Sequence, residues 1–217
     1  LRTSLMFCMT ADKERPCTSF AVTSAKPSEG KSLTAANIAI SYAMLGKKVL
    51  LIDADMRKPT QRRLWRVEKP TGLCDFLAKI SKLELDKVKD LPLWIVCTGT
   101  IPPNPSELLS SERMKHFVEE SAKVYDYIII DTPPINTVAD AQIVSTYVDG
   151  VVLVVKSGDT TQDELNEAID AVRRAGGNLC GTVLNDLNMK SVKYAYKYKY
   201  GGKYGYKYSY SESYEAR

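Results

Sequence analysis

Residues 25–32 read Ala-Lys-Pro-Ser-Glu-Gly-Lys-Ser, and they lie between an apolar run and a helical pattern. The run Phe20–Val22 precedes the octapeptide. The helical pattern follows it, with one face made of Leu33, Ala36, Ile40 and Ala43. The octapeptide fits G-x-x-x-x-G-K-[ST] with alanine in the first position. A strand, this loop and a helix in succession predict a backbone cradle for phosphate at the start of the helix.

The remaining apolar runs predict the fold class. They lack alternation and comprise Val49–Ile52, Ile128–Ile130 and Val151–Val155. A strand that is apolar at every position is buried on both faces, as in a parallel sheet covered by helices. Helical patterns at Ser111–Val124 and Asp163–Ala175 alternate with these runs. The sequence therefore predicts an α/β fold with a doubly wound, mostly parallel sheet flanked by helices.

Two proline-containing stretches, Lys58–Gly72 and Gly99–Pro105, interrupt this pattern. They predict surface loops, where functional sites tend to lie. Ser106 is expected to cap a short helix through Leu109.

The chain of 217 residues ends in a segment of a different kind, because nine of its 13 tyrosines lie in the last 24 residues. They are Tyr194, Tyr196, Tyr198, Tyr200, Tyr204, Tyr206, Tyr208, Tyr210 and Tyr214. No aliphatic residue larger than alanine follows Val192, so this segment cannot form a core of its own. We expect a folded domain over residues 1–189 and a flexible tyrosine-rich tail over residues 190–217.

Charge and cysteine content restrict the possible partners and compartment. The tail carries seven basic and two acidic residues, whereas the whole chain has a net charge of +4. The body is therefore close to neutral, and nucleic acid is not expected as a partner. The five cysteines are scattered without a CxxC pair, which fits reduced thiols in the cytoplasm. No apolar run approaches the roughly 20 residues of a membrane span.

Two further motifs end in carboxylates. Asp53 and Asp55 follow the run Val49–Ile52, at the strand edge where open α/β sheets bind ligands. Two residues apart on an extended chain, they point the same way, so that one can approach Mg²⁺ while the other accepts a proton. Asp131 follows Ile128–Ile130 in the Walker B arrangement, in which the carboxylate helps hold Mg²⁺. Lys31 supplies charge to the β- and γ-phosphates, and the Ser32 hydroxyl is a Mg²⁺ ligand.

Together these motifs resemble the bacterial tyrosine kinases that govern capsular and extracellular polysaccharide synthesis. This family is a branch of the P-loop ATPases related to the ParA/MinD group. The matching segments are Pro27–Ser32, Leu51–Pro59, Pro102–Leu109, Tyr127–Pro134 and the tyrosine cluster. The resemblance implies a protein-tyrosine kinase that uses ATP and Mg²⁺ and autophosphorylates its C-terminal tyrosines.

The resemblance also implies roles for individual residues. Asp53 is the expected base, with Lys31 and Asp55 completing the catalytic group. The expected nucleotide-binding residues are Ser28, Glu29, Gly30, Lys31, Ser32, Leu33, Arg57 and Asn185. The expected metal-binding residues are Ser32, Asp53, Asp55 and Asp131. The nine tail tyrosines are the expected phosphoacceptors. Two roles stay open: Arg57 binds phosphate or a neighbouring subunit, and Asn185 contacts adenine or caps its strand.

The family further implies its partners. The complete proteins assemble into a homo-oligomeric ring through an E-x-x-R-x-x-R element, of which Leu1-Arg2-Thr3-Ser4 resembles the final part. A transmembrane activator, on the same or a separate chain, is implied, together with a tyrosine phosphatase and other polysaccharide-pathway proteins. The expected location is the cytoplasm, at the inner face of the cell membrane through the activator.

Two alternatives remain at this point. A ParA/MinD-type positioning ATPase would use Lys26 as a lysine that reaches a partner's nucleotide, whereas in this family an exposed loop lysine is expected there. Those ATPases prefer Lys-Gly-Gly in the loop and lack a tyrosine ladder. The second alternative is an ATP-dependent interaction module without kinase activity, whose tail is an adhesive ligand.

Overall fold

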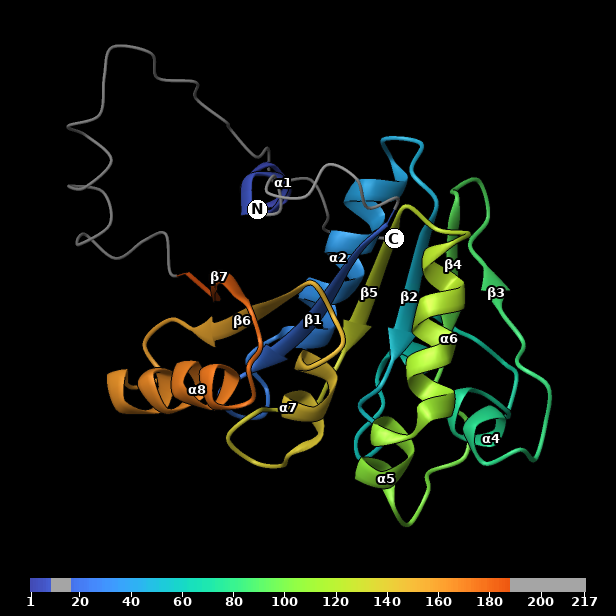
Figure 1. The fold of residues 1–217 in the computed structure, drawn as a ribbon. Helices are drawn as coiled ribbons and strands as arrows, with labels where there is room; N and C mark the ends of the chain where they lie inside the picture. Colours follow the sequence, from blue (N-terminus) through green and yellow to red (C-terminus); the bar gives the residue numbers. More distant parts are fainter. Residues whose placement is uncertain (9–16, 188–217) are drawn as a thin grey trace, which may run out of the picture. The chain divides into compact units, whose positions relative to one another are not determined.

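The computed structural model describes residues 1–8 and 17–187, and a seven-stranded sheet forms its centre. The strand order is β3-β4-β2-β5-β1-β6-β7, and every pair is parallel except β3 with β4. The strands are β1 (Thr18–Ser24), β2 (Val49–Asp53), β3 (Asp86–Lys87), β4 (Leu93–Val96), β5 (Tyr127–Asp131), β6 (Gly150–Lys156) and β7 (Leu179–Asn185). The predicted doubly wound, mostly parallel α/β sheet is confirmed (Figure 1).

Helices cover both faces of the sheet. On one face lie α1 (Arg2–Cys8) and α2 (Lys31–Ala43), which pack with Phe20, Val22 and Leu51. The other face is covered by α6 (Glu112–Ala122), α7 (Asp140–Ser145) and α8 (Gln162–Arg174) (Figure 1). Adjacent strand residues contribute to opposite layers, which explains why the central strands are apolar at every position.

Three short helices lie in the connections: α3 (Gln61–Trp65), α4 (Leu73–Leu77) and α5 (Pro105–Ser110). The prediction of loop throughout Lys58–Gly72 was wrong, because α3 lies within it. A helix of five residues is too short to show a period in the sequence. The cap assigned to Ser106 was also wrong, since α5 begins one residue earlier, with Asn104 at the cap and Pro105 at the first helical position.

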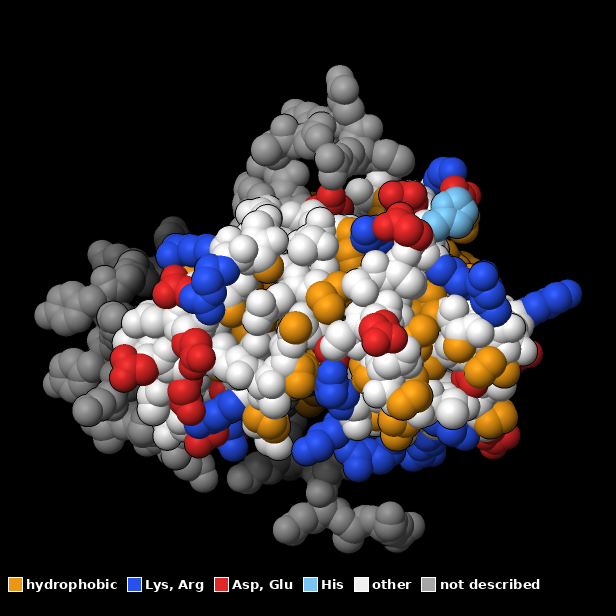
Figure 2. Space-filling model, turned by 60° about the horizontal axis from the view of Figure 1, so that its bottom comes forward, with side chains coloured by type: hydrophobic (Ala, Val, Ile, Leu, Met, Phe, Trp, Pro, Cys, Tyr) orange, Lys and Arg blue, Asp and Glu red, His pale blue; other side chains and the backbone are white. Residues whose placement is uncertain are grey.

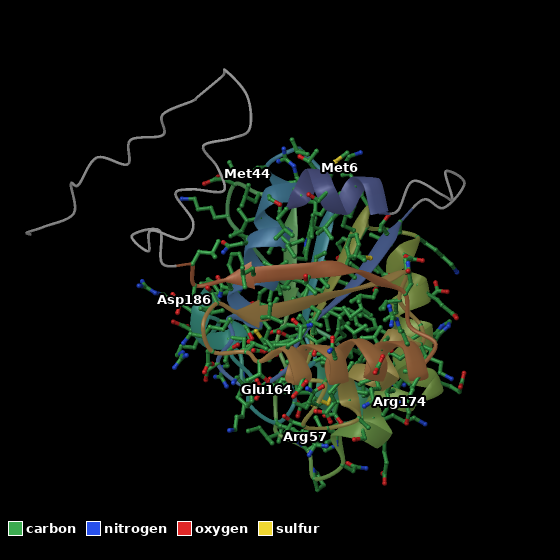
Figure 3. The ribbon with its side chains drawn as sticks, turned by 90° about the vertical axis from the view of Figure 1, so that its left-hand side faces the viewer. Met6, Met44, Arg57, Glu164, Arg174 and Asp186 are labelled. Atoms are coloured by element: carbon green, nitrogen blue, oxygen red, sulfur yellow. The ribbon has the colours of Figure 1, made fainter. Side chains whose placement is uncertain are left out.

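Cys17, Cys74 and Cys97 are free thiols, and all three are buried. None of the helices in residues 1–8 and 17–187 is both long and apolar enough to span a membrane. Figure 3 shows Met6 of α1 and Met44, just after α2, at the opposite end of the molecule from Arg57.

Candidate active site

Three neighbouring strands deliver the three motifs to one edge of the sheet. Strand β5 lies between β1 and β2, and Asp131 pairs in register with both Val22 and Asp53. The loop that follows β1 therefore lies beside the carboxylates that end β2 and β5. The convergence predicted from the sequence is present at the carboxyl edge, as expected for an open α/β sheet.

Lys31 is the centre of this cluster. Its Nζ lies 2.7 Å from Asp55 Oδ2, 3.4 Å from Asp131 Oδ1 and 3.2 Å from Ser32 Oγ. Burial alone would lower the pKa of Lys31, but the charges of Asp131 and Asp55 outweigh it and raise the pKa. The lysine therefore remains protonated, as a group that binds phosphate must.

Asp53, at the end of β2, has no solvent exposure. Its Oδ2 accepts hydrogen bonds from the backbone N–H groups of Thr60 (3.2 Å) and Gln61 (2.9 Å). Its Oδ1 is buried without a hydrogen-bond partner among the described residues. Burial, reinforced by the charge of Asp131, raises the pKa of Asp53 to about 8. A carboxyl group with this pKa is mostly protonated at neutral pH, and its ionised form, which increases as the pH rises toward 8, is the form that can accept a proton.

Gln61 is a site residue that the sequence analysis missed. It is fully buried, and its Nε2 donates to Asp131 Oδ2 at 2.9 Å and to the Ser32 carbonyl at 3.0 Å. Trp65 Nε1 donates to Gln61 Oε1 at 3.0 Å and so fixes the orientation of the amide. Gln61 thus connects α3 to the phosphate loop and to the Walker B carboxylate. A lone glutamine two residues after a proline carries no sequence signal for this role.

The phosphate loop has the backbone shape that a cradle requires. Gly30 has a φ of 88°, in the left-handed region, immediately before α2. Asn185, at the end of β7, donates from Nδ2 to the Glu29 carbonyl at 3.0 Å. Because this contact fixes the loop, the first backbone N–H groups of α2 are presented together to a phosphate.

We expect Gly30→Ala to destabilise the protein by roughly 1–3 kcal/mol, because both strain and a clash result. A Cβ at Gly30 would lie 2.1 Å from Asn185 Nδ2. Gly46→Ala is the matched control, since Gly46 has a φ of 77° but nothing within 4 Å of the added Cβ. Thermal unfolding should show a larger loss for Gly30→Ala than for Gly46→Ala. Equal losses would mean that the loop yields to the added methyl group.

Arg57 is held at the site by two residues from other elements. Its Nε donates to Asp140 Oδ2 at 2.8 Å, and its Nη2 donates to Asp140 Oδ1 at 3.2 Å and to Ser106 Oγ at 3.3 Å. Asp140 is fully buried. Ser106, which the sequence predicted as a helix cap, instead donates to Asp140 Oδ1 at 2.5 Å. The segment Pro102–Leu109 therefore helps to position an arginine beside the acidic cluster.

Lys26 is paired within its own chain. Its Nζ lies 3.2 Å from Glu164 Oε2 in α8 and 2.9 Å from the Asp159 carbonyl. Figure 3 shows Glu164 on the α8 side of the molecule. These contacts direct the lysine toward α8, and a reach into a partner's nucleotide would require breaking them.

A pocket of about 420 Å³ opens at this edge. The predicted site residues that line it are Ser28, Gly30, Lys31, Ser32, Leu33, Asp55 and Arg57. Leu33 is 54% exposed on the first turn of α2. The predicted residues that do not line it are Glu29, Asp53, Asp131 and Asn185. The nine tail tyrosines lie outside the described residues.

The donor set fits Mg²⁺. Lys58 N–H donates to Asp55 Oδ1 at 2.9 Å, while Ser32 Oγ and carboxylate oxygens of Asp55 and Asp131 surround the Lys31 ammonium group. Hard oxygen donors of this kind suit Mg²⁺. Within the described ranges, no group of three or more His, Cys, Asp or Glu residues is arranged to hold a metal by itself. This agrees with the way Mg²⁺ binds in kinases, through one or two carboxylates and the substrate phosphates.

The fold and this site define a P-loop nucleotide-binding domain. A family model described as an AAA domain matches residues 18–179. The tyrosine-protein kinase YwqD of Bacillus subtilis is 43% identical over 199 residues, which cover 90% of this chain and 83% of YwqD. The kinase domain of Escherichia coli ETK superposes with a TM-score of 0.82 at 32% identity, covering 95% of this chain and 77% of that one.

The cell-division ATPase MinD of Pyrococcus furiosus shares the fold, with a TM-score of 0.67 at 20% identity over 80% of this chain and 74% of MinD. The predicted relationship to the P-loop ATPases of the ParA/MinD group is therefore confirmed at the level of the fold. The chain belongs to the family of bacterial tyrosine-protein kinases.

Proposed function

We propose that this kinase transfers the γ-phosphoryl group of ATP to the tyrosines of its own tail, Tyr194 to Tyr214. The observation that carries the proposal is the convergence of Asp55 and the buried Asp131 on Lys31, which lines the pocket with Asp55, together with the buried and partly unpartnered Asp53. A phosphate loop accounts for nucleotide binding. The additional carboxylates provide what transfer to a phenol needs, a proton acceptor close to the transferred group.

In the proposed reaction the phenol oxygen attacks the γ-phosphorus as the bond to the β–γ bridging oxygen breaks. ADP leaves, and the phenolic proton passes to Asp53. A free tyrosine has a pKa of about 10 and is a poor nucleophile at neutral pH, so the proton leaves late. Lys31 stabilises the charge that develops on the phosphoryl oxygens. Arg57, fixed by Asp140 and Ser106, provides a second cation at the wall of the pocket.

Ser32, Asp55 and Asp131 are the residues that would hold Mg²⁺. When bound, the ion would neutralise charge on the β- and γ-phosphates. Asp53 is not among these metal-binding residues. Its Oδ2 accepts the N–H groups of Thr60 and Gln61, and the carboxyl group remains available to accept the proton. Asp55 is the second candidate for that proton, because it lines the pocket whereas Asp53 does not. Comparing Asp53→Asn with Asp55→Asn separates the two assignments.

The consequence of phosphorylation is electrostatic. Each phosphate adds roughly −1.5 to −2 charge, so modification reverses the sign of a tail that has seven basic and two acidic residues. We propose that this reversal switches the protein between assembled and dissociated states. The proposed partners are further copies of the chain, a membrane-bound activator, a tyrosine phosphatase and polysaccharide-pathway proteins. The proposed location is the cytoplasmic face of the membrane, through the activator.

The pairing of Lys26 with Glu164 argues against the positioning-ATPase alternative. In that mechanism the lysine must cross to a partner's nucleotide, whereas here it is bound to α8 of its own chain. The adhesive-module alternative leaves the buried acidic cluster without a role. Burying several carboxylates is costly, and such clusters are typical of functional sites.

Intact-mass spectrometry after incubation with Mg-ATP tests the proposed function. We expect a ladder of added phosphates that peptide mapping confines to residues 194–214. The incubation is repeated with a membrane activator added, so that a kinase that needs the activator is also detected. A chain that hydrolyses ATP but gains no phosphate under either condition would exclude autophosphorylation and favour the ATPase alternatives.

A further inference from the structure

A second pocket lies beside the active-site pocket at the carboxyl edge of the sheet. Its volume is also about 420 Å³, and its walls come from α3 and from the segment that follows β4. Arg63 lines both pockets, so the two are adjacent. Strand β4 pairs with β2, whose end carries the acidic motif, which places the second pocket one strand further along the same edge.

The second pocket is strongly cationic. Arg62 lines it, and Nε and Nη2 of this arginine donate to the carbonyls of Val67 (3.2 Å) and Glu68 (3.0 Å). These contacts fix the guanidinium group but leave its charge without a carboxylate. Among the residues that the structure describes, Arg62 and Arg63, which both line this pocket, form no ion pair. Figure 2, which brings the carboxyl ends of the strands forward, shows Lys and Arg side chains gathered along this edge.

The same pocket has an apolar wall. Pro59 and Val67 line it together with Ile101, which is 61% exposed. Figure 2 shows apolar side chains next to the basic ones on this face. A ligand that binds both the arginines and the apolar wall has a flat or apolar body and an anionic end. Arginine binds phosphate in a bidentate manner, so a phosphorylated aromatic side chain matches this combination.

The tail supplies such a ligand only after the kinase has acted. Before modification it is rich in lysine, so the arginines repel it. After modification it presents phosphotyrosine. In an extended peptide, residues two apart point the same way, and two residues span roughly 7 Å. The spacing of two residues between Tyr204, Tyr206, Tyr208 and Tyr210 therefore allows one ring to enter the active-site pocket while another enters its neighbour.

We propose that the second pocket binds phosphorylated tyrosines of the tail and thereby makes tail phosphorylation processive. This inference rests on the proposed autophosphorylation. Once one tyrosine carries phosphate, its docking beside Arg62 and Ile101 holds an unmodified tyrosine of the same tail at the active site. The next transfer then proceeds at a high effective concentration of acceptor. The alternating arrangement of the tyrosines then has a function, because it places successive rings on the same side of the tail.

Direct binding is the first test. The probe is a fluorescent peptide of residues 203–211 with phosphotyrosine at Tyr206, titrated into the full chain prepared without ATP. A saturating non-hydrolysable ATP analogue with Mg²⁺ occupies the phosphate loop. We expect the phosphopeptide to bind at least about tenfold more tightly than the unmodified peptide and than the same peptide phosphorylated only at Ser209. Equal affinities for the three peptides would overturn the proposal.

Variants of one exposed position locate the binding site. Ile101→Asp adds a negative charge to the wall and should weaken phosphopeptide binding at least about tenfold, whereas Ile101→Lys should not weaken it. Arg62→Gln should act like Ile101→Asp. Arg174→Gln, an exposed change on α8 outside both pockets, is the matched control. If Ile101→Asp and Arg174→Gln bind the phosphopeptide equally well, the site lies elsewhere.

A time course of intact masses tests the consequence. The original chain should accumulate unmodified and multiply phosphorylated species together at early times. Ile101→Asp should add its first phosphate at the same rate but then pass through singly and doubly modified species in turn. Identical distributions in the two proteins would overturn processivity. If the original chain gains no phosphate, the proposed function fails, while the peptide titration still decides whether the pocket binds phosphotyrosine.

Discussion

Lys31→Met is expected to lower tail phosphorylation by at least about 10²–10³-fold and, separately, to destabilise the fold. Activity falls because the cation that stabilises the transferred phosphoryl group is removed. Stability falls because Lys31 is a buried partner of Asp55 and Asp131, at 2.7 Å and 3.4 Å. Removing one side of a buried ion pair typically costs about 3–5 kcal/mol. Phosphate incorporation and thermal unfolding measure the two effects.

A lysine variant of this kind is therefore an unsafe inactive control unless its fold is examined. Lys31→Met/Asp55→Asn should recover part of the lost stability, since it removes one unpaired charge, but it should stay inactive. Lys123→Met, at the exposed cap that follows α6, should change neither property much, because a surface ion pair contributes about 0–1 kcal/mol. A Lys31→Met protein as stable as the original would show that the ion pairs contribute little.

The central sheet was predictable because its strands lie between two apolar layers. Phe20 and Val22 pack toward α2 while Ala21 packs toward the opposite layer, so no alternation appears in the run. The convergence of the three motifs was also predictable, because parallel strands end at one edge of the sheet. The edge strand β3 and its neighbour β4 were not predicted. Two residues give β3 no pattern, and β4 has only four.

The contacts that complete the site could not be predicted, because they join residues far apart in the chain. Gln61 depends on the five-residue helix α3 to reach Asp131, 70 positions away. Asp140 reaches Arg57 across 83 positions. Neither Gln61 nor Asp140 lies in a sequence motif. Such partners are determined by tertiary packing, which a local pattern does not encode.

The Asp53→Asn variant is expected to lower tail phosphorylation by roughly 10²–10⁴-fold while ATP still binds, because only the proton acceptor is lost. Unlike Lys31→Met, it should make the protein more stable in metal-free buffer at pH 8, because the variant has no buried carboxylate to ionise there. The Asn oxygen can still accept the N–H groups of Thr60 and Gln61, while a buried charge near Asp131 is removed. Asp55→Asn should be destabilising instead, since it removes a partner of Lys31.

The pH dependence gives this prediction its sharpest test. Burial and the charge of Asp131 raise the pKa of Asp53 to about 8 in the folded protein, against an ordinary value of 3.8. Between these values the folded state retains a proton that the unfolded state has lost. Asp53 therefore lowers the free energy of unfolding as pH rises from about 4 to about 8, and its cost is greatest above that window. The stability gained by Asp53→Asn should be small at pH 5 and full at pH 8.5, whereas Glu167→Gln on exposed α8 should show no such trend. A gain that does not change with pH would mean that Asp53 is not the group whose buried charge destabilises the site.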